Sequence, residues 1–191
     1  MLAAGQSSRL GQSKQLLEFQ GECLVNRTVR VCLEAGIAKV LVVLGFEEAR
    51  VRTEVEAAFE PSAVQCVSNP YWAQGMGASI AAGASVLDAG TEGCWLLTCD
   101  QVAMQPEVLE RMWARFAEGD ASIVNCNYGD AVGPPVLFAE THFAALKQLN
   151  GESGAKSVIS ANRDAVRSVL FENGDLDIDF PEDLSRLGDS L

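Results

Sequence analysis

The chain opens with Met1-Leu-Ala-Ala-Gly-Gln-Ser-Ser-Arg-Leu-Gly-Gln-Ser-Lys14, where small residues, glycines and two basic side chains coincide. Gly5 and Gly11, among small neighbours, leave backbone N–H groups open to a close ligand, and Arg9 and Lys14 are the only charged side chains of the stretch. A glycine-rich turn that is rich in donors and locally positive suits a bound triphosphate. It follows neither the Walker A nor the G-x-G-x-x-G pattern. The stretch therefore predicts a nucleotide-phosphate loop of another kind, with a flexible polar terminus as the alternative.

Composition narrows the class of protein. The 191 residues carry a net charge of -12 and are 48% hydrophobic, which predicts one globular domain over residues 1–191. The acidic balance argues against nucleic acid or an anionic membrane as partner. An apolar run long enough to cross a membrane and a signal peptide are both lacking. Six scattered cysteines without C-x-x-C, and a single histidine, predict no zinc site and a reducing, cytoplasmic setting.

Apolar runs and amphipathic stretches alternate along the chain. The runs predict strands over residues 39–45, 63–67, 94–98, 121–126, 135–138 and 166–171. The stretches between them predict helices over residues 24–35, 47–58, 76–87, 106–117 and 182–187. This order predicts an α/β fold, a three-layer, open and mainly parallel sheet of Rossmann-like type. Such sheets bind ligands at the carboxyl ends of their strands.

Two groups of carboxylates are candidates for holding a metal ion. Asp100 ends the apolar run that begins at Cys94, so it is expected at the carboxyl end of a strand, facing the cleft. Mg²⁺ is bound by one or two carboxylates together with phosphate oxygens, and Asp100 suits that role. A helix N-cap or turn is the alternative. Asp175, Asp177 and Asp179 alternate and would share one face of an extended segment, unless this is a solvated acidic loop.

Two further segments carry candidate binding residues. Residues 69–79 place Gly75, Gly77 and Ser79 ahead of or within a helix start, where a glycine-rich turn can lie flat against a base or ribose. An ordinary loop, with Trp72 covering the core, is the alternative. His142 is expected to be a surface or capping residue rather than a base.

The opening stretch resembles the signature L-A-A-G-x-S-x-R-[ML]-G-x-x-K of nucleotidyltransferases similar to the molybdenum cofactor guanylyltransferases, and more narrowly of the molybdenum cofactor cytidylyltransferases. Four later segments occur in the family's order, so the resemblance covers nearly the whole chain. They are residues 69–79, 97–101, 133–138 and 177–183. The resemblance implies a nucleotide-diphospho-sugar transferase-like fold.

The sequence departs from the family's pattern at several positions. Family members carry several apolar residues before L-A-A-G, so the first strand is expected to be truncated, either reduced to Met1-Leu-Ala or absent. The family's G-D-Q-P reads Cys99-Asp100-Gln101-Val102 here, and Phe180 replaces the threonine of D-I-D-T-P-E-D. Lys156 replaces the arginine of G-D-x-G-A-R, which keeps the charge and loses the bidentate fork.

The resemblance implies roles for individual residues. Arg9, Lys14 and Asp100 would be catalytic, with the two basic groups stabilising the β- and γ-phosphates. Asp100 with Asp177 or Asp179 would hold Mg²⁺, and Lys156 would meet the acceptor's phosphate. The remaining predicted binding residues are Leu2, Ala3, Ala4, Gly5, Ser7, Gly75 and Ser79.

The implied reaction is transfer of CMP from CTP to the molybdopterin of the molybdenum cofactor, with release of pyrophosphate. Ala4 replaces a glycine of the related guanylyltransferases and leaves room for a pyrimidine rather than a purine. Three alternatives remain: guanylyl transfer, another phosphate acceptor, and a carrier that delivers the cofactor without turnover. A molybdoenzyme that accepts the product is a possible protein partner.

Overall fold

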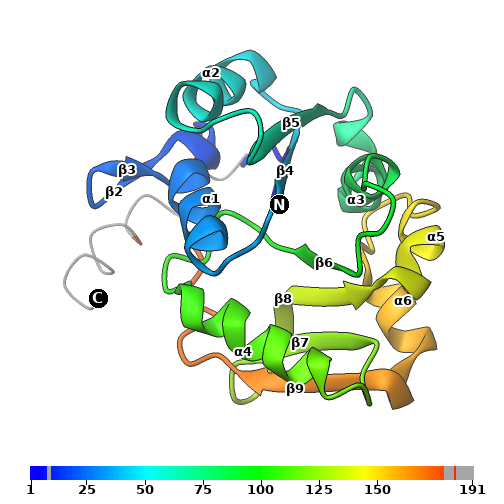
Figure 1. Cartoon of the computed structure of the whole chain (residues 1–191). Helices are drawn as coiled ribbons and strands as arrows, with labels where there is room; N and C mark the ends of the chain where they lie inside the picture. Colours follow the sequence, from blue (N-terminus) through cyan, green and yellow to red (C-terminus); the bar gives the residue numbers. More distant parts are fainter. Residues whose placement is uncertain (8–9, 179–182, 184–191) are drawn as a thin grey trace.

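Seven of the described strands form two neighbouring sheets in the computed structural model, which describes residues 1–7, 10–178 and 183 (Figure 1). In the first sheet, β1 (Leu2–Ala3), β4 (Val40–Leu44) and β5 (Val64–Ser68) are parallel and lie in that order. The second has the order β6 (Gly93–Leu96), β8 (Val132–Ala139), β7 (Ile123–Asn127) and β9 (Val166–Leu170).

Strand β1 joins the two sheets although it is only two residues long. Leu2 pairs with Val43 of β4 on one side and forms a parallel bridge with Thr98 on the other. The Leu2 N–H donates to the carbonyl oxygen of Leu97 at 2.8 Å. Among the strand pairs of these two sheets, as far as the structure describes them, only those of β8 with β6 and β7 are antiparallel. The mainly parallel α/β sheet is therefore confirmed, with a first strand reduced to Leu2–Ala3.

Helices cover both faces of this sheet and make three layers (Figure 1). On one face, α1 (Leu24–Glu34), α2 (Glu48–Ala58) and α4 (Pro106–Ala117) share a core with the sheet. On the other lie α3 (Met76–Ser85), α5 (Phe143–Leu146) and α6 (Lys156–Ala161). The alternation of β8 explains both cores, because Leu137 packs into the first while Val136 and Phe138 pack into the second.

The helices begin and end where local chemistry predicts. Pro106 starts α4. The first helical position suits proline, which lacks an N–H, because an N–H there would have no partner within the helix. Gly36 follows α1 with φ +78°, the left-handed conformation that glycine adopts most readily. Three of the four longer helices lie within a residue of their predicted bounds, and α3 ends two residues early. Of the helix predicted over residues 182–187, the structure describes only residue 183.

Several elements were not predicted. A hairpin of β2 (Glu18–Phe19) and β3 (Glu22–Cys23) turns at Gln20 and Gly21, both at positive φ. Short 3₁₀ segments lie at Lys14–Leu16 (η1), Trp72–Gln74 (η2), Glu140–His142 (η3) and Arg163–Ala165 (η4). These elements are too short to carry a readable hydrophobic period.

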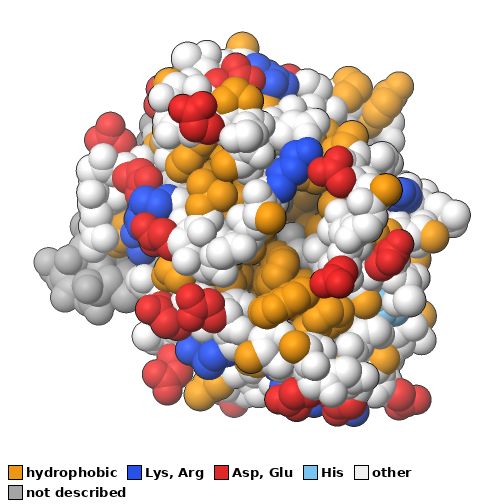
Figure 2. Space-filling model, in the orientation of Figure 1, with side chains coloured by type: hydrophobic (Ala, Val, Ile, Leu, Met, Phe, Trp, Pro, Cys, Tyr) orange, Lys and Arg blue, Asp and Glu red, His pale blue; other side chains and the backbone are white. Residues whose placement is uncertain are grey.

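An apolar cavity of about 680 Å³ lies between β4 and β6, beside Met1. Leu41 lines it from β4, and Cys94 and Trp95 line it from β6. Figure 2 shows apolar side chains gathered around a hollow near the middle of the face of the molecule that it displays. Within the described residues, none of the helices has the length and apolar character that a membrane span requires.

Candidate active site

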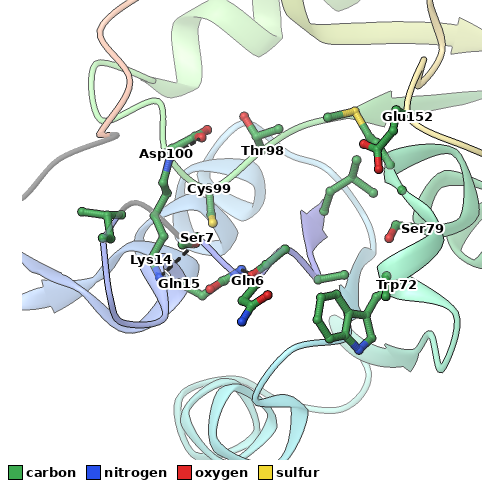
Figure 3. Close-up of a pocket in the computed structure, with 17 residues that line it drawn as sticks. Gln6, Ser7, Lys14, Gln15, Trp72, Ser79, Thr98, Cys99, Asp100 and Glu152 are labelled. Atoms are coloured by element: carbon green, nitrogen blue, oxygen red, sulfur yellow. Dashed lines mark hydrogen bonds and ion pairs between the residues drawn. The ribbon is translucent and has the colours of Figure 1, made fainter.

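A second cavity, of about 570 Å³, opens where β1 and β6 end (Figure 3). Figure 3 shows Ser7, Lys14 and Asp100 toward one end of this cavity and Trp72 and Ser79 toward the other. The lining comprises Leu2, Ala4, Gly5, Gln6, Ser7, Leu10, Lys14, Gln15, Trp72, Ala73, Gly75, Met76, Ser79, Thr98, Cys99, Asp100 and Glu152. The cavity lies at the carboxyl ends of parallel strands, where α/β sheets bind their ligands.

Side chains of the opening segment brace its backbone. Gln15 is 3% exposed, and its Nε2 donates to the carbonyl oxygen of Gly5 at 3.0 Å. Ser13 Oγ donates in turn to Gln15 Oε1 at 2.7 Å, and Ser7 Oγ accepts the Lys14 N–H at 3.3 Å. These bonds tie residues 13–15 to Gly5 and Ser7 in the cavity wall. The sequence interpretation did not single out Gln15, whose type carries no signal of this role.

Gly5 has open space beside it. A Cβ built on this residue would meet none of the described atoms within 4 Å, and Gly5 is exposed in the cavity wall. The described part of the protein therefore has no steric need for glycine at this position. A ligand that approaches the backbone closely would supply one.

Lys14 and Asp100 form an ion pair inside the cavity. Lys14 Nζ lies 3.0 Å from Asp100 Oδ2, and the two side chains are 12% and 23% exposed. The other carboxylate oxygen, Oδ1, is buried and has no hydrogen-bond partner among the described residues. A buried carboxylate oxygen without a partner is unfavourable unless a donor or cation reaches it. Asp100 is therefore suited to bind a cation.

The second carboxylate segment lies beside the first. Asp177 forms an isolated antiparallel bridge with Gln101, the residue that follows Asp100. Asp177 is exposed and is not among the residues that line the cavity. In the described part of the chain, no cluster of three or more His, Cys, Asp or Glu side chains could hold a metal. Two carboxylates together with phosphate oxygens would suffice for Mg²⁺. Two predicted site residues, the metal ligand Asp179 and the catalytic Arg9, lie outside the described residues.

Cys99 occupies the position before Asp100 and lines the cavity while only 6% exposed. Burial raises the pKa of its thiol from 9.0 to about 12. In the absence of a metal ion the side chain is therefore neutral near pH 7. Thr98, one residue earlier, also lines the cavity, and the sequence interpretation gave it no role.

The glycines at the start of α3 have a packing role within the protein. A Cβ on Gly75 would lie 2.5 Å from the Gly151 carbonyl oxygen, and one on Gly77 would lie 2.5 Å from that of Asn150. The Gly77 N–H also donates to Gly151 O at 2.8 Å. The absence of side chains thus lets residues 150–152 dock against α3, rather than only leaving room for a base. Gly75 still lines the cavity.

Asn69 orients Ser79, which lines the same part of the cavity. Asn69 is 2% exposed, its Nδ2 donates to Ser79 Oγ at 3.0 Å, and its Oδ1 accepts the Tyr71 N–H at 3.0 Å. The start of residues 69–79 is therefore a structural brace for the end of that segment.

Three predicted residues lie away from the cavity or differ from expectation. Lys156 is exposed at the start of α6 and does not line the cavity, which Glu152 lines instead. The Ala3 side chain is 1% exposed and packs into the core, so only its backbone is near the site. His142 is at the N-cap position of α5, as one of its two expected placements required, but it is not a surface residue: it is 8% exposed, and its Nε2 hydrogen-bonds with Ser122 Oγ at 2.8 Å.

Known proteins resemble this chain over nearly its full length. The model of the MobA-like NTP transferase domain matches residues 1–166. The purine catabolism protein PucB of Bacillus subtilis (strain 168) is 29% identical over 190 residues, 95% of this chain and 91% of that protein. The molybdenum cofactor cytidylyltransferase of Escherichia coli (strain K12) is 24% identical over 183 residues, 95% and 90% of the respective chains.

Solved structures agree in fold. A crystal structure of Rv0371c from Mycobacterium tuberculosis H37Rv matches with a TM-score of 0.81 at 29% identity, covering 98% of this chain and 95% of that one. The complex of Rv0371c with manganese matches with a TM-score of 0.76 at 27% identity, covering 100% and 96%.

Proposed function

This chain belongs to the MobA-like NTP transferase domain family, and we propose that within it the protein transfers CMP from CTP to the molybdenum cofactor, releasing pyrophosphate. The nucleotidyltransferase class follows from the family. We further propose that the nucleotide is CTP, that the acceptor is the molybdenum cofactor, that the metal is Mg²⁺, and that the site residues act as described below.

One observation carries the proposal: the Lys14–Asp100 pair in the cavity at the ends of β1 and β6. A nucleotidyl transfer needs a cation for the phosphates and a carboxylate for a divalent metal, and this pair offers both. Catalysis of this type requires positioning and neutralisation of charge more than covalent chemistry. Lys14 would bind the β- and γ-phosphates and stabilise the departing pyrophosphate, and Arg9 would assist it.

The donor set of the site fits a hard divalent cation. Asp100 Oδ1 is buried without a partner, and carboxylate oxygens are the ligands that Mg²⁺ and Mn²⁺ prefer. Asp100, with Asp177 or Asp179, would hold Mg²⁺. When bound, the metal would neutralise charge on the phosphate oxygens. The manganese complex of Rv0371c supports a divalent metal in this group of proteins.

The chain's own groups would orient the two substrates. The acceptor phosphate is already a nucleophile, so no covalent enzyme intermediate is required. The Ala4 and Gly5 backbone and Ser7 would contact the nucleotide, together with Leu2, Ala3, Gly75 and Ser79. Lys156 is proposed to meet the acceptor's phosphate from outside the cavity.

The choice of CTP rests on Ala4 and on a named relative. Ala4 is 4% exposed, and its methyl group narrows the cavity where the related guanylyltransferases carry glycine. The similarity to the E. coli molybdenum cofactor cytidylyltransferase favours the same pair of substrates. The chain is more similar to PucB, at 29% identity, than to the cytidylyltransferase, at 24%, so the acceptor of the nucleotide needs its own test.

Calorimetric titration with CTP, GTP and ATP, each with and without Mg²⁺, tests the proposal first. Of the three nucleotides we expect CTP alone to bind, weakly without Mg²⁺ and more tightly with it, and we expect Asp100→Ala to abolish the gain that Mg²⁺ gives. Asp88→Ala is the matched control, because Asp88 also pairs with a lysine at 3.0 Å but does not line the cavity. Turnover is then measured as pyrophosphate released from CTP when molybdenum cofactor is added.

The other outcomes separate the alternatives. Binding of GTP in place of CTP would favour guanylyl transfer. Binding of CTP without pyrophosphate release would favour a different acceptor. Tight binding of the cofactor without binding of any nucleotide would favour a carrier and contradict the proposed reaction.

A further inference from the structure

We propose that Gln101 is a positioning residue, whose side-chain amide holds the segment bearing Asp177 against the strand end bearing Asp100. The proposal rests on the proposed function, because it assigns the two carboxylates to one divalent cation. Gln101 does not line the cavity, so it would act through these neighbours rather than on a substrate.

The Gln101 amide joins three segments that are far apart in sequence. Its Nε2 has two N–H groups to donate and lies within hydrogen-bond distance of three oxygens, the hydroxyl of Tyr128 at 3.0 Å, the carbonyl of Pro134 at 3.0 Å and that of Gly174 at 2.7 Å. The residue is 5% exposed, so water does not readily replace these bonds. The segment that follows β6, the β7–β8 hairpin and the segment before Asp177 therefore meet at one side chain.

Close packing limits how far these segments can slide. A Cβ on Gly174 would lie 2.5 Å from the rings of both Phe171 and Tyr128, and one on Gly133 would lie 2.8 Å from the Tyr128 hydroxyl. The rings of Tyr128 and Phe171 pack edge to face, with 5.9 Å between the ring centroids. The acceptors of the Gln101 amide thus belong to a tightly packed unit.

The backbone carries this restraint to Asp177. Asp177 pairs with Gln101 in the antiparallel bridge, and the next N–H, of Ile178, donates to the carbonyl of Asp100 at 3.3 Å. Ile178 itself is fully buried. Asp177, by contrast, is exposed, so the burial of its own side chain does not fix its position.

Metal binding is sensitive to such restraints. Mg²⁺ requires near-ideal octahedral geometry, and residues behind the ligands commonly change metal affinity by about 10–100-fold. Loss of the Gln101 amide should therefore weaken metal binding while leaving the phosphate loop, which lies on other elements, intact.

The test uses Gln101→Met, which keeps the length of the side chain and removes its donors. Mn²⁺ binding in the presence of CTP is followed by electron paramagnetic resonance, and CTP binding without metal by calorimetry. We expect the Mn²⁺ dissociation constant to rise about 10–100-fold, with metal-free CTP binding unchanged. Saturating metal should restore kcat, and unchanged Mn²⁺ affinity would overturn the proposal.

Controls separate positioning from general stability. Asn125→Leu removes another buried amide, one that bonds to Ser168 in β9 away from the cavity, and should lower Tm without changing Mn²⁺ affinity. If Gln101→Met does not fold, Tyr128→Phe removes one partner of the amide and should give a smaller shift of the same sign. No shift in Tyr128→Phe would then count against the proposal.

A third comparison separates this inference from the proposed function. If Asp100→Asn and Asp177→Asn abolish Mn²⁺ binding while Gln101→Met does not, only the role of Gln101 is wrong. If the aspartate variants bind Mn²⁺ normally, the metal site of the proposed function is wrong, and the inference fails with it.

Discussion

Lys14 Nζ lies 3.0 Å from Asp100 Oδ2, although 86 residues separate the two in sequence. The pair joins the opening loop to the end of β6. Because both side chains are mostly buried, their attraction exceeds that of an exposed surface pair. A metal ion that binds Asp100 must compete with the Lys14 ammonium, and a triphosphate would offer that ammonium another partner.

The pair predicts opposite effects of Lys14→Met on metal and nucleotide. Without the competing ammonium, Mn²⁺ alone should bind more tightly than to the unaltered protein. CTP without metal should bind about 10–100-fold more weakly, since a hydrogen bond to a charged group contributes about 1.5–3 kcal/mol. Calorimetry with each ligand separately measures both effects.

Lys39→Met provides the control for this prediction. It breaks the exposed Lys39–Asp88 pair, which also spans 3.0 Å, and removes the same charge from the protein. The affinities for Mn²⁺ alone and for CTP without metal should both stay unchanged. Equal Mn²⁺ affinities of Lys14→Met and the unaltered protein would show that Lys14 does not compete for Asp100.

Asn69→Ala tests the brace beneath the start of α3. It removes a buried side chain that bonds Ser79 Oγ and the Tyr71 N–H. The loss of these bonds should reduce the free energy of unfolding by about 1–3 kcal/mol. Urea denaturation measures this change. A free energy equal to that of the unaltered protein would mean that the turn is held by its other contacts.

Buried thiols predict a loss of stability at alkaline pH. Burial raises the pKa of Cys32 from 9.0 to about 11, and that of Cys99 to about 12. The folded chain keeps these protons while the unfolded chain loses them above pH 9. The stabilisation is therefore complete below pH 9 and is lost as the pH rises through the window from 9 to 12.

Urea denaturation of Cys32→Ala at several pH values checks the sign. The variant should lose stability less steeply than the unaltered protein above pH 9. Parallel pH curves for the two proteins would show that Cys32 does not contribute to the alkaline slope.

Much of the fold could be predicted because its strands are continuous apolar runs with clear ends. Residues 39–45 were predicted as a strand, and β4 spans Val40–Leu44. The direction of β8 could not be predicted, since a short apolar run reads the same in a parallel and an antiparallel pair. The hairpin at Gln20 and Gly21 was missed because each of its strands has only two residues.

The parts of the candidate site that could be predicted are those whose role shows in the neighbouring residues of the sequence. A lysine in a glycine-rich loop and an aspartate after a strand can be read from sequence, and the fold brings Lys14 and Asp100 together. The support for the site cannot be read in this way. Gln15 and Gln101 act through bonds to backbone carbonyls, and the partners of Gln101 lie 27 to 73 residues away.

Two glycine-to-alanine variants separate ligand contact from protein packing. At Gly5 a Cβ meets no atom of the described residues within 4 Å, so Gly5→Ala should change the free energy of unfolding by less than about 0.5 kcal/mol. Its methyl group would occupy the cavity where the nucleotide is proposed to approach the backbone, so the CTP dissociation constant should rise. At Gly77 the Cβ would lie 2.5 Å from the Asn150 carbonyl oxygen, so Gly77→Ala should lower Tm. Thermal unfolding and CTP titration of both variants measure the contrast. Unaltered CTP binding by Gly5→Ala would mean that the nucleotide does not lie against this part of the loop, since nothing in the protein itself opposes the methyl group.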